Sequence, residues 1–304
     1  MSPSTVFPSI FTILRAMLLA CALAAATSAQ ADTRTYTVTA PDGVALAVRE
    51  SGDPRGTPVI FVHGLLGSTL NWDAQTADPR LQSYRLISYD MRGHGLSGKP
   101  VTAEAYSDGR RWADDLQTVI KSSRATKPVL VGWSLGATVI TNYLAAYGDG
   151  AIAGALYADG VIELKPEQIV AHPEVYRDLN APDLKTHLDA VREFLRLCFY
   201  TQPAAQDFER LLASAAVASW DMQRSVQSMK VDVARGLGKA TVPVLLIYGA
   251  RDALVKAGPS IARATEVNPR IRATLYDESG HAPFFEEPER FNRDLSGFID
   301  GLKR

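Results

Sequence analysis

Three side chains whose types suit nucleophilic catalysis occur in the order Ser134, Asp252 and His281. Ser134 lies between Gly132 and Gly136, after a short apolar, β-branched run and before a helical pattern. This is Gly-x-Ser-x-Gly at a strand-to-helix turn, the context in which a serine becomes a nucleophile. A serine hydroxyl reacts poorly at neutral pH, so it needs a histidine to take its proton and a carboxylate to orient that histidine. The three residue types predict acyl transfer through a covalent serine intermediate.

The turn itself explains the two glycines. It strains the serine backbone, so side chains larger than hydrogen at Gly132 and Gly136 would clash. It also lifts the Ser134 hydroxyl above the sheet edge. The helix that begins near Leu135 points its free backbone N–H groups at the same place, where a negative charge would be stabilised.

Asp252 and His281 each follow a buried apolar run, at residues 242–248 and 271–276. The carboxyl ends of parallel strands meet at one edge of a sheet, and open α/β sheets hold their ligands there. We therefore expect both side chains at the edge that carries Ser134.

Alternating strands and helices must position these residues. A hairpin is predicted at 36–48, around the turn Pro41-Asp42-Gly43, and further strands at 58–62, 84–89, 129–131, 152–157, 242–248 and 271–276. Helical patterns separate most of the later strands, which predicts an α/β fold with a mostly parallel central sheet and helices on both faces. From about 161 to 235 the apolar spacing is helical only, as at Leu184, Leu188, Val191, Leu195 and Cys198. We interpret this stretch as a helical cap over the sheet edge.

Residues 1–31 have the layout of a secretory signal peptide. One charge, Arg15, precedes an apolar run from Ala16 to Ala26 and the small-residue triplet Ala29-Gln30-Ala31. The run is too short to span a membrane, and we expect cleavage before Asp32 and a secreted or periplasmic protein. Lipid attachment at Cys21 is the alternative.

Cleavage would leave residues 32–304 as one domain of 273 residues. Loss of Arg15 from the 32 basic residues leaves 31 against 33 acidic ones, a formal charge of −2. That balance gives no sign of a nucleic-acid partner or an anionic membrane surface. Cys198 would be the only cysteine, so no intramolecular disulfide is expected, and no zinc-type spacing of cysteine and histidine occurs. We expect neither a metal nor a cofactor.

Taken together, these motifs resemble the α/β-hydrolase superfamily, in its single-domain esterase and cofactor-free haloperoxidase branch. The resemblance rests on His63-Gly64, the stretch at 90–97, the serine motif, the acid loop at 249–252 and Ser279-Gly280-His281. It implies that Ser134 is the nucleophile, Asp252 the acid and His281 the base. It also implies that the backbone N–H groups of Leu65 and Leu135 form the oxyanion hole.

Other assignments stay open at this stage. Asp159 follows the preceding strand, where some members of the superfamily keep their acid, although we favour Asp252. Leu66 and Trp133 are candidates for the substrate pocket, together with the cap residues Leu188, Leu195 and Phe199. For Trp133, packing beneath the turn is an equal alternative. If these close over the sheet edge, we expect an apolar pocket on the order of several hundred Å³.

The remaining histidines of the predicted mature chain have structural or solvated interpretations. We expect His63 to shape the oxyanion loop through bonds to backbone, and His94 with Arg92 to hold a loop. His172 and His187 are expected to be solvated in the cap.

The resemblance implies a serine hydrolase that cleaves a carboxylic ester of a small or medium-sized substrate. Lactone hydrolysis, or perhydrolysis with the same three residues, is the alternative. A non-catalytic binding protein is a third possibility, which the complete set of three residues disfavours. The acyl group, the alcohol and the oligomeric state are left open by the sequence.

Overall fold

The computed structural model describes residues 33–302, so the expected signal peptide and Cys21 lie outside the described residues. Its centre is an eight-stranded sheet in the order β1-β2-β4-β3-β5-β6-β7-β8. β1 and β2, and β2 and β4, pair antiparallel, and the other neighbours pair parallel. The strands are β1 (Arg34–Thr39), β2 (Ala45–Gly52), β3 (Pro58–Val62), β4 (Arg85–Tyr89), β5 (Val129–Trp133), β6 (Gly154–Ala158), β7 (Val244–Gly249) and β8 (Arg272–Tyr276).

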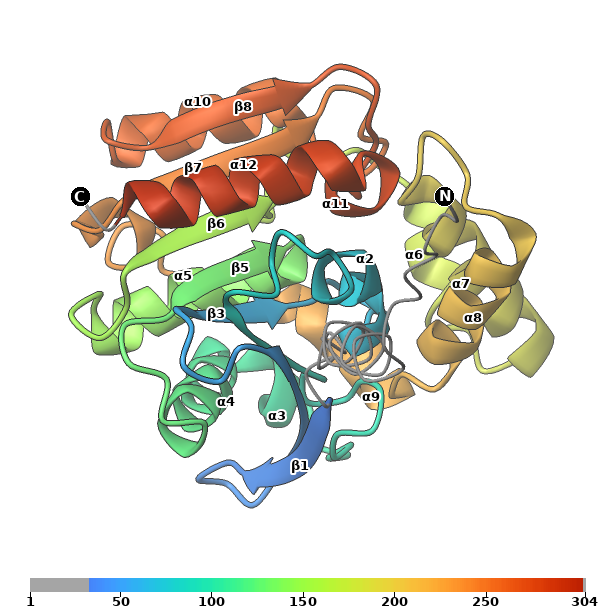
Figure 1. Cartoon of the computed structure of the whole chain (residues 1–304). Coiled ribbons are helices and arrows are strands. Elements are labelled where there is room, and N and C mark those ends of the chain that lie inside the picture. Colours follow the sequence, from blue (N-terminus) through green and yellow to red (C-terminus); the bar gives the residue numbers. More distant parts are fainter. Residues whose placement is uncertain (1–32, 303–304) are drawn as a thin grey trace, which may run out of the picture. The chain divides into compact units, whose positions relative to one another are not determined.

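Helices lie on both faces of this sheet, as Figure 1 shows for α12 in front of it and α10 behind it. The helices outside the cap are α2 (Asp73–Thr76), α3 (Glu104–Ser107), α4 (Gly109–Ser122), α5 (Leu135–Tyr147), α10 (Ala257–Val267), α11 (Pro283–Glu286) and α12 (Pro288–Gly301). Short 3-10 helices are η1 (Thr69–Trp72) and η3 (Leu237–Lys239). The predicted fold class, a mostly parallel sheet covered on both sides, is confirmed.

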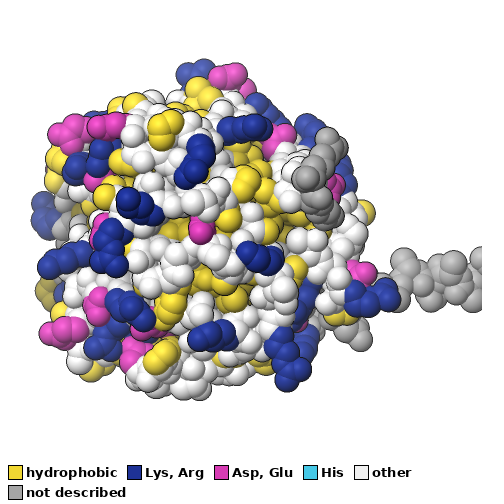
Figure 2. Space-filling model, turned by 90° about the vertical axis from the view of Figure 1, so that its left-hand side faces the viewer, with side chains coloured by type: hydrophobic (Ala, Val, Ile, Leu, Met, Phe, Trp, Pro, Cys, Tyr) yellow, Lys and Arg dark blue, Asp and Glu magenta, His cyan; other side chains and the backbone are white. Residues whose placement is uncertain are grey.

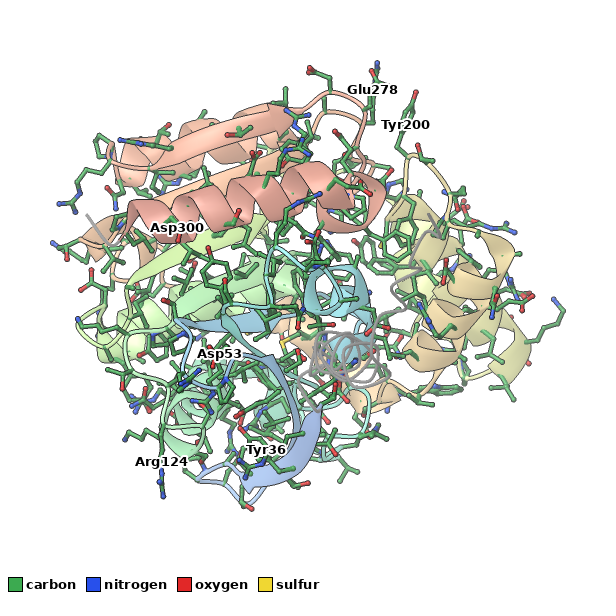
Figure 3. The ribbon with its side chains drawn as sticks, in the orientation of Figure 1. Tyr36, Asp53, Arg124, Tyr200, Glu278 and Asp300 are labelled. Carbon is green, nitrogen blue, oxygen red and sulfur yellow. The ribbon has the colours of Figure 1, made fainter. Side chains whose placement is uncertain are left out.

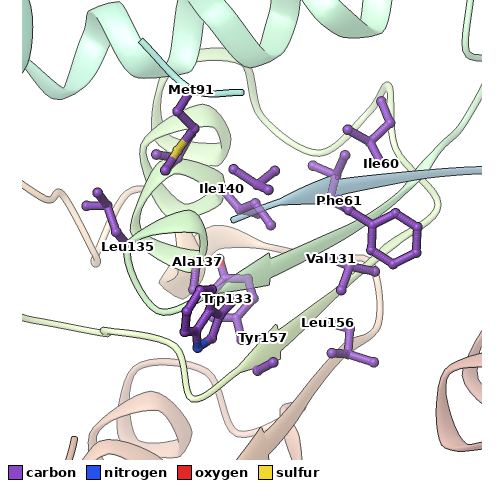
Figure 4. Packing of buried hydrophobic residues seen from close by; sticks show 14 of the residues in the cluster. Ile60, Phe61, Met91, Val131, Trp133, Leu135, Ala137, Ile140, Leu156 and Tyr157 are labelled. Atoms are coloured by element: carbon purple, nitrogen blue, oxygen red, sulfur yellow. The ribbon is translucent and has the colours of Figure 1, made fainter. Parts of the chain in front are cut away.

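The central strands are buried on both faces, which explains their unbroken apolar sequences. Every residue of β5 and of β6 is buried. Figure 4 shows side chains of β3, β5 and β6 packed together with those of α5 in this core. Such a core fixes the strand ends, and therefore the loops at the carboxyl edge, in one place.

Between β6 and β7 the chain forms helices α6 (Pro173–Asp178), α7 (Leu184–Leu197), α8 (Ala205–Ala216), α9 (Trp220–Ser225) and the 3-10 helix η2 (Val226–Ser228). In this fully described stretch the only β pairing is the isolated bridge of Ile169 with Val255. In Figure 1, α6, α7 and α8 stand on the side toward which the parallel strands point.

One expectation about the cap was wrong. His187 is fully buried rather than solvated, because its ring lies 4.1 Å from that of Trp220 and its Nδ1 bonds to the Leu179 carbonyl at 2.9 Å. The buried stripe of α7 also includes Phe194, whereas Leu184 is 60% exposed and Leu188 38% exposed.

None of the helices within residues 33–302 combines the length and apolarity that crossing a bilayer requires. On the face drawn in Figure 2, basic and acidic side chains are interspersed among apolar ones.

Candidate active site

Ser134 occupies a strained turn between β5 and α5. Its φ of 51° lies in the left-handed region, which a non-glycine residue adopts only under constraint from its surroundings. The constraint is visible: the Ser134 N–H donates to the Ala158 carbonyl at 3.0 Å, and the Ser134 carbonyl accepts from the N–H groups of Ala137 and Val161.

The flanking glycines are required by close packing, as the sequence predicted. A Cβ atom on Gly136 would lie 2.2 Å from the Val62 carbonyl oxygen, and one on Gly132 would lie 2.7 Å from the Ala137 nitrogen. Both distances are far shorter than any van der Waals contact, so a larger residue at either position would push the turn off the sheet edge.

Asp252 and His281 are in direct contact. The Nδ1–H of His281 donates to Oδ2 of Asp252 at 2.7 Å, and both side chains are almost completely buried. Oδ1 of Asp252 accepts from the N–H groups of Leu254 at 2.7 Å and Val255 at 3.0 Å. Asp252 is thus held by three donors, and the bond to Nδ1 leaves Nε2 of His281 as the proton acceptor. Among the two candidate acids, the one bonded to His281 is Asp252.

Leu65 and Leu135 lie beside Ser134 in the lining of one cavity. Within the described part of the chain, neither backbone N–H donates a hydrogen bond to a protein acceptor. An oxyanion that forms beside Ser134 would need unpaired N–H donors of this kind.

Two buried histidines hold the loop that carries Leu65. His63 donates from Nδ1 to the Gly64 carbonyl at 2.8 Å and accepts from the Met91 N–H at Nε2. His94 accepts from the Leu66 N–H at 3.3 Å. Burial lowers the pKa of His63 to about 4 and that of His94 to about 3, so both rings stay neutral at neutral pH and accept these N–H bonds. The structural roles expected for the two rings agree with these bonds.

Arg92 has the loop-holding contacts that the sequence analysis expected. It is fully buried, and it forms ion pairs with Asp115 at 2.6 Å and with Asp42 at 2.9 Å. A charge buried this deeply needs such partners, and they leave Arg92 committed to the protein rather than to a substrate.

A cavity of about 480 Å³ opens above Ser134 and His281. Its volume agrees with the expected several hundred Å³. Most of its lining is apolar and comes from the cap and from the loop after β7: Val161, Leu164, Ile169, Val170, Tyr176, Phe194, Val226, Leu254 and Val255.

The predicted pocket residues Leu66 and Trp133 do not line this cavity. Leu66 has a φ of 60° and turns into the core, where it is buried. Trp133 packs beneath the turn, since its Nε1–H donates to the His281 carbonyl at 2.7 Å and its ring lies 5.7 Å from that of His281. Trp133 therefore supports the site from below and is not available to a substrate.

The predicted cap residues also differ. Leu188 lines a separate groove between α7 and α8, and Leu195 is buried within the cap. Phe199 packs against Phe285 at 5.2 Å. Sequence analysis missed Phe194, which shares a stripe with His187 and Val191 at spacings of four and three. That stripe was the available signal.

Glu286 joins the cap to the loop of His281. Its carboxylate accepts from the Gly280 N–H at 2.8 Å and from the Thr201 N–H at 2.7 Å. Figure 3 shows Tyr200, which precedes Thr201, and Glu278, which lies two residues before Gly280, projecting outward near each other. Sequence analysis did not single out Glu286, because its two partners are backbone groups.

Asp159 lies next to this arrangement. A carboxylate oxygen from each of Asp159 and Asp252 and a ring nitrogen of His281 lie within 4.8 Å of one another. Within residues 33–302 this is the one cluster of three side chains of types that metals use. The Asp252–His281 hydrogen bond already engages two of the three side chains.

Comparisons with known proteins identify the family to which this fold belongs. A family model described as the alpha/beta hydrolase family matches residues 59–294. The crystal structure of a candidate aryl esterase from Burkholderia cenocepacia is 71% identical, covers 88% of this chain and 99% of its own, and superposes with a TM-score of 0.88. The bifunctional esterase/perhydrolase of Acinetobacter calcoaceticus is 28% identical over 86% of this chain and 98% of its own length. A non-heme chloroperoxidase of Streptomyces lividans is 26% identical over 86% and 99%.

Proposed function

We infer the function from the premise that this chain belongs to the alpha/beta hydrolase family. We propose that it is a serine hydrolase that cleaves a carboxylic ester through an acyl-enzyme. The observation that carries the proposal is one cavity lined by Ser134, by His281 and by the residues whose N–H groups are free, Leu65 and Leu135. The esterase descriptions of similar proteins support it.

The Asp252–His281 hydrogen bond and the position of Ser134 in the same cavity support the following mechanism. Oγ of Ser134 attacks the ester carbonyl while Nε2 of His281 takes its proton, and Asp252 stabilises the imidazolium that forms. The N–H groups of Leu65 and Leu135 bind the oxyanion. His281 then protonates the leaving alcohol, and water activated by the same ring cleaves the acyl-enzyme to release the acid.

The apolar lining sets the expected substrate range. Each methylene that enters the cavity contributes roughly 0.8 kcal/mol, or about fourfold in kcat/KM, until the cavity is full. For p-nitrophenyl esters we therefore expect kcat/KM to rise from acetate to a short or medium acyl chain and then to fall. A continued rise to palmitate would contradict an enclosed pocket.

A matched pair of substitutions in α7 tests which surface binds the acyl chain of the ester. Phe194→Ala enlarges the cavity and should move the optimum toward longer esters. Leu188→Ala, on the same helix but outside the cavity, should leave the optimum in place. If no ester is hydrolysed although a phosphonate labels Ser134, the substrate is a lactone, a thioester or a peracid.

Perhydrolysis is a second candidate, favoured by the relative described as an esterase/perhydrolase. Acetic acid would acylate Ser134 with loss of water, and hydrogen peroxide would then attack the acetyl-enzyme in place of water, which gives peracetic acid and free Ser134. We would then expect halogenation that requires both peroxide and acetate and is lost on phosphonate labelling. Halogenation that survives labelling would argue against this use of the site.

We also propose export from the cytoplasm, on the basis of residues 1–31. The intact mass of the exported protein should correspond to a chain that begins at Asp32. A lipid-modified mass that begins at Cys21 would favour the anchored alternative.

A further inference from the structure

The carboxyl group of Asp159 is enclosed behind the Asp252–His281 pair. It follows β6 directly, with a φ of 42°, and it is fully buried. The left-handed backbone is unusual for a non-glycine residue and costs free energy. It aims the side chain at the end of β7, from which the Asp252 loop departs.

The two oxygens of Asp159 have different surroundings. Oδ1 accepts from the Gly249 N–H at 2.9 Å. Oδ2 is buried and receives a hydrogen bond from no donor in the described chain. Asp252, in contrast, accepts three hydrogen bonds, including the one from His281. Asp252 has the environment of a carboxylate, while Asp159 has that of a carboxylic acid whose O–H needs an acceptor.

The acceptor within reach is Asp252. Two carboxylate groups in contact can share a hydrogen bond only if one of them is protonated. Burial is the largest cause that raises the pKa of Asp159 well above its usual range. The charge of Asp252, the hydrogen bond with Asp252 and the charge of Glu286 on α11 raise it further.

The other titratable groups around this pair are uncharged at neutral pH. Tyr248 on β7, Tyr157 on β6 and the Cys198 thiol in the cap are all buried, and burial raises the pKa of each. When His281 takes the serine proton, its positive charge lies next to Asp252, its direct partner.

We propose that Asp159 is a neutral carboxylic acid that donates its Oδ2–H to Asp252 and thereby positions the Asp252 carboxylate for His281. The proposal rests on the proposed function, because it gives Asp252 the role of the acid. Asp159 keeps its proton throughout the reaction and touches no substrate, so it is a positioning residue.

Infrared difference spectroscopy tests the protonation state without any assay of activity. At pH 8 the unliganded protein should show the C=O band of a protonated carboxyl group, and Asp159→Asn should lose it. Asp277→Asn, an exposed aspartate on the loop after β8, should keep it. A band that is absent from the wild type would overturn the proposal even if the protein is an active esterase, whereas a band in a protein without esterase activity would leave it standing and overturn the proposed function.

The pH profile of kcat/KM tests the positioning role. Asp159→Leu removes the donor, so we expect a loss of kcat of roughly tenfold or more and an acidic limb displaced to higher pH, because Asp252 becomes more basic. Asp159→Asn restores a donor from Nδ2 while its Oδ1 accepts from Gly249, and it should rescue both values. If Asp159 were ionised, the Asn variant would instead lose a negative charge near His281, and its acidic limb would move down by about one pH unit. That downward shift, or a Leu variant with an unchanged profile, would overturn the proposal.

Discussion

Replacement of Ser134 by alanine is expected to lower ester hydrolysis by roughly a millionfold, because the attacking oxygen is lost and His281 has no proton to accept. The fold should survive. The Ser134 side chain makes no hydrogen bond that fixes the turn, and the backbone bonds to Ala158, Ala137 and Val161 are unchanged by the substitution.

The measurement is kcat/KM for the best p-nitrophenyl ester, together with the midpoint of thermal unfolding. Ser122→Ala is a matched control, since Ser122 lies exposed at the end of α4. Substantial hydrolysis by pure, folded Ser134→Ala protein would mean that the nucleophile lies elsewhere, and the proposed mechanism would have to be abandoned.

Replacement of Asp252 by asparagine is expected to lower kcat by about 10⁴-fold while KM changes little. Asparagine has nearly the shape of aspartate, but it carries no charge to stabilise the imidazolium. Its amide can also donate to Nδ1 of His281, which would leave the ring in the tautomer that cannot accept the serine proton.

Asp277→Asn makes the same chemical change at an exposed position and should behave as wild type. Comparison of the two variants separates loss of the acid from a general effect of removing one charge. An Asp252→Asn protein with near wild-type kcat would instead mean that Asp159, and not Asp252, is the acid that orients His281.

The strands were predictable because apolar runs such as 58–62 and 129–131 are typical of central strands that are buried on both faces. The same reasoning placed Asp252 and His281 at one edge, and their contact at 2.7 Å is present. Asp252 lies three residues after the end of β7 and His281 five residues after the end of β8, so each strand end restricts where its side chain can lie.

The pocket was less predictable, because its lining depends on how the cap docks. The pattern of α7 is compatible with more than one buried stripe, and the sequence does not say which one faces the sheet. The left-handed backbone of Leu66, which removes its side chain from the site, also has no sequence signal. Trp133 was ambiguous for a related reason: an apolar residue beside a nucleophile can face either the substrate or the core.

Glu286 has a consequence for how molecules enter and leave. The Glu286 carboxylate accepts hydrogen bonds from the N–H of Gly280, next to His281, and from the N–H of Thr201, in the cap. A lid motion that carried residue 201 away from the sheet would have to break a charge-assisted bond or drag the loop of His281 with it. Movement of the cap at residue 201 would then displace the loop of His281, so that an enzyme with the cap lifted would have its general base out of position.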